Sequence, residues 1–137
     1  MFQNPDPDTI RALLKGAGTI AVVGYSPRTD RPSHRIASAL RGAGYRVIAV
    51  RPGISEALGE RAYPNLRAVP DSVDIIDVFR ASEHAAEVID DCIAKGAKVV
   101  WFQDGVYDEP AGARAQAAGM TVIMDRCIWR DHRALVR

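Results

Sequence analysis

The chain has few cysteines and aromatic residues and no excess of either charge. Its 137 residues include two cysteines, which stand far apart and near no histidine pattern suited to zinc. We therefore expect neither a disulfide framework nor a metal site. The formal net charge is +1 and aromatic residues make up 7% of the chain. A balanced total charge argues against broad attraction to nucleic acid or to an anionic membrane surface.

The sequence also lacks a long apolar run and a leader-like start. No stretch approaches the roughly 20 apolar residues of a membrane-spanning helix, and the first residues do not follow the pattern of a signal peptide. We therefore expect a cytoplasmic protein without a membrane segment. The length fits one domain over residues 1–137, which can bury a core without disulfides or metal.

A recurring pattern of helix, glycine and apolar strand organises the chain. Glycine ends a helical segment at positions 16, 42, 96 and 119, and an apolar run follows each time. Apolar periodicity predicts helices over 7–16, 33–42, 82–95 and 108–118, the third of them capped by Ser82. The five predicted strands are 19–23, 45–50, 73–79, 98–102 and 120–124.

Nearly all-apolar strands that alternate with helices indicate a parallel sheet covered on both faces. The predicted fold class is therefore α/β, a Rossmann-like, doubly wound, five-stranded parallel sheet. Right-handed crossovers favour the strand order 3-2-1-4-5, with the switch point between the first and fourth strands. Residues 51–72 are broken up by proline and glycine, so a short element and a turn are expected there in place of a crossover helix.

Arginines gather at the predicted carboxyl ends of the strands, where ligands bind in this architecture. Arg51, Arg80 and Arg126 follow three of the strands, and the first loop adds Arg28 and Arg31. This pattern predicts a polyanionic ligand. The alternative is that the arginines pair with nearby carboxylates, for which four candidates are available: Asp30, Asp77, Asp104 and Asp125.

The end of the second strand argues against NAD. NAD-binding sheets usually place an acidic residue there to accept the ribose hydroxyls, whereas this chain has Arg51. The fingerprint Gly-x-Gly-x-x-Gly is also missing, since Gly24 is followed by Tyr25, Ser26 and Pro27. An arginine suits a ribose phosphate, which both NADP and coenzyme A carry.

The motifs taken together resemble a known family over nearly the whole chain. They are Val-Val-Gly-Tyr-Ser at 22–26 with Asp-Arg-Pro-Ser at 30–33, Val-Arg-Pro at 50–52, Val-Asp-Ile-Ile-Asp-Val-Phe-Arg at 73–80 and Val-Val-Trp-Phe-Gln at 99–103. The chain is similar to small stand-alone CoA-binding proteins related to the CoA-binding domain of the succinyl-CoA synthetase alpha subunit. Relatives often have Asn-Pro after the second strand, where this chain has Arg51-Pro52.

The resemblance implies that the protein holds coenzyme A or an acyl-CoA, with an acyl-CoA-using enzyme as a candidate partner. The first loop would hold the pyrophosphate, the end of the second strand would lie by the adenosine and its ribose phosphate, and two further strand ends would line the groove. The candidate ligand-binding residues are Gly24, Tyr25, Ser26, Arg28, Arg31, Pro32, Ser33, Val50, Arg51, Pro52, Phe79, Arg80 and Gln103.

No catalytic constellation stands out in the sequence. The chain shows no Ser-His-Asp order, carboxylate pair or metal-ligand cluster, and we expect Asp77 to cap a helix or bind an arginine. Cys92 and Trp101 are expected in the core. The sequence thus supports a binding module. Two other interpretations stay open: a small NADP-dependent oxidoreductase or redox sensor, and an interaction subunit whose groove is vestigial.

Overall fold

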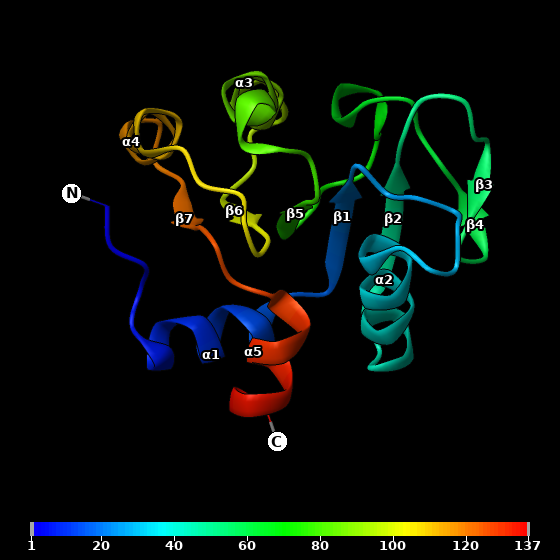
Figure 1. The fold of residues 1–137 in the computed structure, drawn as a ribbon, viewed down its shortest axis with the longest axis horizontal. Coiled ribbons are helices and arrows are strands. Elements are labelled where there is room, and N and C mark those ends of the chain that lie inside the picture. The colour runs from blue at the N-terminus through cyan, green and yellow to red at the C-terminus, as the bar shows by residue number, and fades with distance from the viewer. Residues whose placement is uncertain (1, 137) are drawn as a thin grey trace.

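The computed structural model describes residues 2–136 of the chain, and a parallel sheet of five strands forms its centre (Figure 1). The strands lie in the order β2-β1-β5-β6-β7, and each neighbouring pair runs parallel. Every residue of β5 and β6 is buried, as expected for central strands covered on both faces. Their bounds are β1 Thr19–Val23, β2 Arg46–Val50, β5 Ile75–Val78, β6 Val99–Phe102 and β7 Thr121–Ile123.

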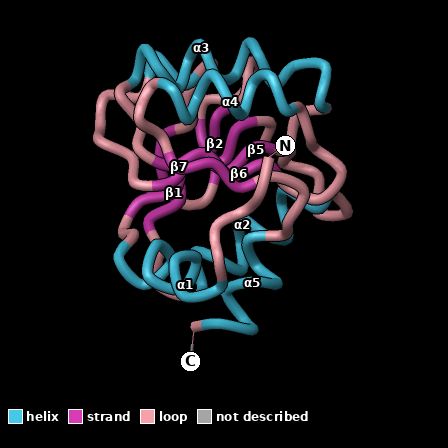
Figure 2. Tube along the Cα trace, turned by 90° about the vertical axis from the view of Figure 1, so that its left-hand side faces the viewer, coloured by secondary structure: helices cyan, strands magenta, loops and turns pink. Residues whose placement is uncertain are grey.

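Helices cover both faces of the sheet, as Figures 1 and 2 show. Alternate residues of β1 divide between two cores: Ile20 and Val22 face one helical layer, and Ala21 and Val23 face the other. The predicted α/β, doubly wound fold class is confirmed. One layer contains α1 (Pro7–Gly16), α2 (Pro32–Gly42) and α5 (Ile128–Leu135), and the other contains α3 (Ala85–Lys95) and α4 (Glu109–Ala117).

The predicted strand order was wrong in one respect. The third long strand, β5, pairs with β1 and not with β2, so the order counted over the five strands is 2-1-3-4-5. The switch point therefore lies between β1 and β5, whereas the sequence predicted it between the first and fourth strands. Ligands in this second doubly wound arrangement also bind where the strand order reverses.

The segment after β2 explains the difference, because it occupies the outer edge of that strand. Tyr63 bridges Val50 in parallel, accepts a hydrogen bond from the Arg51 N–H and donates its own N–H to Ala49. No place is left beside β2 for another strand, so the chain crosses to the other side of β1. As expected, the segment has no full helix. It contains the two-stranded hairpin β3 (Glu56–Ala57) and β4 (Glu60–Arg61) and the 3-10 helix η1 (Leu66–Ala68).

Two local predictions near helix ends need correction. Ser82 does not cap α3: it opens the 3-10 helix η2 (Ser82–His84), and its hydroxyl accepts from the Tyr107 N–H at 2.8 Å and donates to the Gly105 carbonyl at 3.3 Å. The hydroxyl therefore fastens the loop after β6. The polar C-terminal stretch, for which no helix was predicted, forms α5.

No helix within residues 2–136 has the length and apolar character needed to cross a membrane.

Candidate functional site

A cleft of about 770 Å³ opens at the carboxyl edge of the sheet, on the face covered by α2. Its volume falls within the range typical of small-molecule sites. The lining spans the ends of β2, β1, β5 and β6 and the first turn of α2. Nine of the thirteen candidate ligand-binding residues line it: Gly24, Ser26, Arg28, Arg31, Pro32, Ser33, Arg51, Phe79 and Gln103.

Four further lining residues were missed by sequence reasoning. Arg35 and Ile36 lie in α2 just beyond Ser33, and Asp104 and Val106 lie in the loop after Gln103. The sequence contains a pattern near each pair that could have predicted its place in the cleft. Helical periodicity brings Ile36 onto the face of Ser33, and the strand-end rule extends from Gln103 to the loop that follows it.

The other four candidates lie elsewhere. Val50, Pro52 and Arg80 line a second cleft of about 450 Å³ on the opposite face of the sheet, toward α3, and Gly24 lines both clefts. The Tyr25 side chain is buried in the core on the α2 side, with its ring centre 6.0 Å from that of His34. Its role in the structure is therefore packing.

Ser33 holds the loop between β1 and α2 in place. Its hydroxyl is buried and accepts a hydrogen bond from the Ser26 N–H at 2.9 Å. Because α2 begins at Pro32, which has no N–H, the Ser33 amide is the first donor of the helix. It has no acceptor among residues 2–136. A helix N-terminus with a free N–H at a cleft favours an anionic group.

The arginines of the cleft differ in how they are paired. Arg28 lies 3.2 Å from the Asp30 carboxylate, and Arg35 donates to the Asp30 carbonyl at 2.8 Å. Arg31 and Arg51 form no ion pair or side-chain hydrogen bond with any residue in the described range 2–136. The cleft therefore presents cations whose charge the rest of the protein leaves uncompensated.

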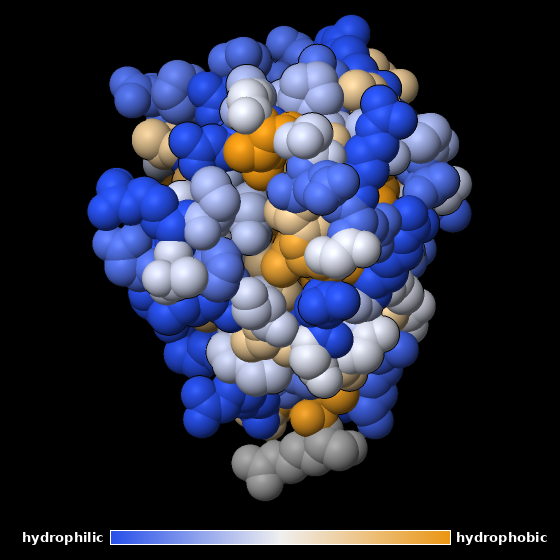
Figure 3. Space-filling model, turned by 90° about the vertical axis from the view of Figure 1, so that its right-hand side faces the viewer, coloured by the Kyte–Doolittle hydropathy of each residue, from blue (hydrophilic) through white to orange (hydrophobic). Residues whose placement is uncertain are grey.

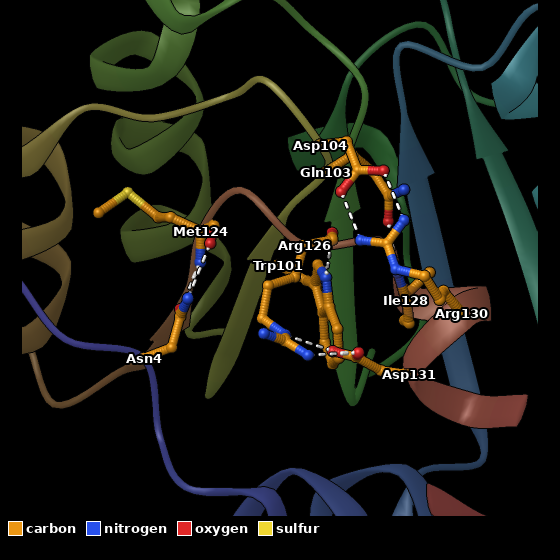
Figure 4. A network of polar contacts seen from close by, with 9 residues as sticks. All are labelled: Asn4, Trp101, Gln103, Asp104, Met124, Arg126, Ile128, Arg130 and Asp131. Atoms are coloured by element: carbon orange, nitrogen blue, oxygen red, sulfur yellow. Dashed lines mark hydrogen bonds and ion pairs between the residues drawn. The ribbon is translucent and has the colours of Figure 1, made fainter. Parts of the chain in front are cut away.

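Asp104 is the acidic side chain of the cleft, and Arg130 of α5 neutralises it. The two form a double contact at 2.8 and 2.9 Å, and the guanidinium lowers the pKa of the Asp104 carboxyl. Figure 4 shows this pair beside Gln103 at the end of β6. The carboxylate thus cancels little of the positive charge that the free arginines contribute.

The close packing of the ends of β1 and β5 explains why position 24 is a glycine. Its φ is +84°, and a Cβ at this position would lie 3.0 Å from the Arg80 Cγ and 3.3 Å from the Phe79 carbonyl carbon. Both the conformation and the space exclude most side chains. Glycine is therefore required for β1 and β5 to approach each other, whatever binds above them.

Several hydrogen bonds fasten α5 to the end of β6, as Figure 4 shows. The Gln103 Oε1 accepts from the Ile128 N–H at 3.0 Å, and the Trp101 indole donates to the Arg126 carbonyl at 2.9 Å. Arg126 in turn makes two contacts of 2.7 Å with the nearly buried Asp131. The wall of the cleft near β6 is therefore tied to the C-terminal helix. Trp101 is fully buried, as predicted.

Asp77 does not cap a helix or bind an arginine, so that prediction was wrong. It lies in β5 between Val22 and Trp101 of the neighbouring strands and is fully buried, and neither of its carboxylate oxygens has a hydrogen-bond partner among residues 2–136. Burial raises the pKa of this carboxyl well above its usual value.

Cys92 is buried as predicted, and burial raises the pKa of its thiol to about 12. Within residues 2–136 no cluster of three potential metal ligands occurs.

The chain is similar to proteins from bacteria and archaea. It is 42% identical to the uncharacterized protein YneT of Bacillus subtilis over 131 residues, which cover 96% of this chain and 97% of YneT. A hypothetical protein from Pyrococcus horikoshii OT3 superimposes with a TM-score of 0.93 at 33% identity, over 100% of this chain and 99% of that one.

A third similarity concerns one part of a larger enzyme. An ADP-forming acetate–CoA ligase of Archaeoglobus fulgidus is 30% identical over 73 residues, which represent 53% of this chain and 11% of the ligase. The model of a protein family described as "CoA binding domain" matches residues 18–133. This range contains the whole carboxyl-edge cleft, and we conclude that the chain belongs to the CoA binding domain family.

Proposed function

We propose that this protein binds coenzyme A or an acyl-CoA in the carboxyl-edge cleft. The observation that carries the proposal is the uncompensated positive charge of Arg31 and Arg51 beside the free Ser33 N–H. Coenzyme A carries a pyrophosphate and a ribose phosphate, so it offers anionic groups to both arginines. Family membership supports the same ligand.

The distribution of charge along the cleft favours one orientation of the bound coenzyme A. Arg51 follows β2 and the arginines of the loop and α2 lie next to β1, whereas Gln103 and the neutralised Asp104 follow β6. From β2 to β6 the sheet spans three strand spacings, about 14 Å. The nucleotide end of coenzyme A belongs at the cationic side, and the uncharged pantetheine arm extends toward β6.

The second cleft offers a place for the adenine ring. Its lining combines apolar residues, among them Val50 and Leu66, with the polar and charged residues Asn65, Arg80, Glu87 and Asp91. Flat apolar surfaces with a few polar groups suit a heterocycle. Since Gly24 lines both clefts, a ligand that crosses this glycine would place its adenine in the second cleft and its pyrophosphate in the first.

The role that we propose is binding, with the acyl-CoA delivered to or sensed for a partner enzyme. The similar acetate–CoA ligase is much longer than this chain. A CoA-binding domain of this kind would hold the thioester for chemistry supplied elsewhere.

NADP is the second candidate ligand, and one observation favours it. Arg51 at the end of β2 stands where an arginine in dinucleotide-binding sheets meets the 2′-phosphate. NADP and coenzyme A differ in the position of the ribose phosphate and in the pantetheine arm, so competition separates them.

Calorimetric titration with coenzyme A, dephospho-CoA and NADP tests the proposal. We expect saturable binding of coenzyme A, weaker binding of dephospho-CoA and no competition by NADP. If NADP displaces coenzyme A or binds more tightly, the second candidate replaces the first. If the folded protein binds none of the three, the cleft is vestigial and the proposed function is wrong.

A further inference from the structure

The side-chain amide of Gln103 has only one possible orientation. Its Oε1 accepts the hydrogen bond of the Ile128 N–H at 3.0 Å, at the start of α5. A backbone N–H can only donate, so the acceptor must be the oxygen of the amide and not its nitrogen. The Nε2 group therefore points away from Ile128.

The Nε2 group of Gln103 is a donor without an acceptor among residues 2–136. Gln103 is only 5% exposed, yet Nε2 donates to no residue in the range 2–136. It is not sealed off, because the only fully buried unpartnered side-chain atoms in that range are the two oxygens of Asp77. Gln103 lines the carboxyl-edge cleft, so the cleft is where an acceptor can reach it.

We infer that Gln103 is a specificity-determining residue whose Nε2 donates to a carbonyl oxygen of the ligand's arm. The inference rests on the proposed function, which places the pantetheine arm at the β6 side of the cleft. When the arm of the ligand covers this amide and displaces water from it, the Nε2 group loses free energy unless the ligand supplies an acceptor. A carbonyl meets this need, and the arm of an acyl-CoA offers two kinds, the pantetheine amides and the thioester.

The attachment of α5 gives this donor its selectivity. Since the Ile128 N–H holds Oε1, the amide cannot rotate to present its oxygen to the ligand. The cleft therefore accepts a carbonyl at this point and rejects a group that can only donate. The bidentate pair of Asp104 and Arg130 holds the same helix beside Gln103 and adds to the fixed geometry of the wall (Figure 4).

Two variants and two ligands test the inference. Gln103→Glu keeps an oxygen for the Ile128 N–H and loses the donor, and Gln103→Leu removes the donor without adding charge. Each variant is titrated with coenzyme A and with 3′-phospho-ADP, which carries the nucleotide and lacks the arm. We expect both variants to lose roughly three- to tenfold in affinity for coenzyme A and to keep the wild-type affinity for 3′-phospho-ADP.

A control variant separates the donor from the attachment of α5. Asp131→Asn weakens the contact with Arg126 at a site that does not line the cleft, and we expect it to bind both ligands as the wild type does. Thermal unfolding of each variant confirms that it is folded. Repeating the titrations with acetyl-CoA identifies the carbonyl: an equal loss for both CoA ligands indicates a pantetheine amide, and a loss for acetyl-CoA alone indicates the thioester.

The outcomes that contradict the inference differ from those that contradict the proposed function. If Gln103→Leu binds both coenzyme A and acetyl-CoA as tightly as the wild type, or loses equal affinity for coenzyme A and 3′-phospho-ADP, Gln103 does not contact the arm. The same holds if Asp131→Asn lowers coenzyme A affinity as much as Gln103→Leu does. If the wild type binds neither coenzyme A nor 3′-phospho-ADP, the proposed function itself fails.

Discussion

The two edges of the sheet carry grooves of similar size that differ in how far their charged side chains are already paired. The groove at the amino edge measures about 690 Å³ and the carboxyl-edge cleft about 770 Å³. At the amino edge, Asp74 accepts from two backbone N–H groups and Lys95 donates to two carbonyls. Of the charged side chains that line that groove, only Lys98 makes no such contact within residues 2–136.

The difference shows that pairing of charge, more than volume, distinguishes a ligand site here. At the carboxyl edge Arg31 and Arg51 have no carboxylate partner in the described part of the chain, and the first donor of α2 is free. A charged side chain that already forms ion pairs or hydrogen bonds within the protein stabilises the fold and is poorly available to bind a ligand. Unpaired charges at a cleft are available for an anion, which is why we assign coenzyme A to this edge.

The largest expected effect concerns the two free arginines. Each charge-assisted contact contributes about 1.5–3 kcal/mol, so the double variant Arg31→Ala with Arg51→Ala should lose at least about hundredfold in coenzyme A affinity if the two effects add. Lys98→Ala at the amino edge is the matched control and should bind as the wild type does. Calorimetry measures all three proteins. An equal loss in the Lys98 control would mean that net charge, and not the site, drives binding.

Titration with dephospho-CoA sharpens the role of Arg51. If Arg51 meets the ribose phosphate, Arg51→Ala should weaken coenzyme A binding more than dephospho-CoA binding. Equal losses for the two ligands would reject that role and leave Arg51 as a general attractant.

The next largest effect concerns the pH dependence of the unfolding free energy, which the buried, unpaired Asp77 carboxyl should dominate. The pKa of Asp77 is raised in the folded state, so the folded protein keeps a proton that the unfolded chain has released. Stability is then highest below the unfolded pKa and falls as the pH rises toward the folded pKa, by up to about 1.4 kcal/mol per pH unit. Asp77→Asn should remove this decline. Urea unfolding at several pH values measures it, and parallel curves for the two proteins would contradict the account.

Asp74→Asn provides the comparison from the amino edge. The Asp74 carboxylate accepts from the Gly18 and Thr19 N–H groups at 2.8 and 2.9 Å. We expect this variant to be less stable than the wild type at neutral pH by about 1 kcal/mol, whereas Asp77→Asn gains stability there.

Two glycines with similar positive φ angles give a smaller effect. Gly24 has a φ of +84° with backbone and side chain close by, whereas Gly53 has a φ of +87° and open space around it. Gly53→Ala should cost about 1 kcal/mol for the left-handed backbone alone, and Gly24→Ala about 2–3 kcal/mol. Unfolding free energies measure both. Equal costs would show that the packing of β1 against β5 tolerates a methyl group.

The smallest effect concerns the exposed pair of Asp104 and Arg130. Both side chains are more than half exposed, so Arg130→Gln should change the unfolding free energy by less than about 1 kcal/mol. The pKa of Asp104 should nevertheless rise, because the neighbouring guanidinium lowers it in the wild type. An NMR titration of the Asp104 carboxyl measures this change. An unchanged pKa would mean that the pair is not formed in solution.

Local patterns predicted the elements well and failed on long-range pairing. Apolar runs and glycine-terminated helices identified the five strands, and several of the arginines predicted at the strand ends line the cleft at the carboxyl edge. The strand order was missed because it depends on Tyr63 pairing beside Val50, which no local pattern reveals. Asp77 was misjudged because a lone polar residue in an apolar strand looks the same whether it finds a partner or is buried without one.

Chemical-shift mapping on the ¹⁵N-labelled protein tests the central claim most directly. On addition of coenzyme A, we predict that amide signals move at the carboxyl edge, in the loop from Gly24 to Ser33 and at Arg51 and Gln103. Signals around Asp74, Lys95 and Lys98 should stay in place. Shifts concentrated at the amino edge, or no shifts in a folded protein, would contradict the assignment of coenzyme A to the carboxyl-edge cleft.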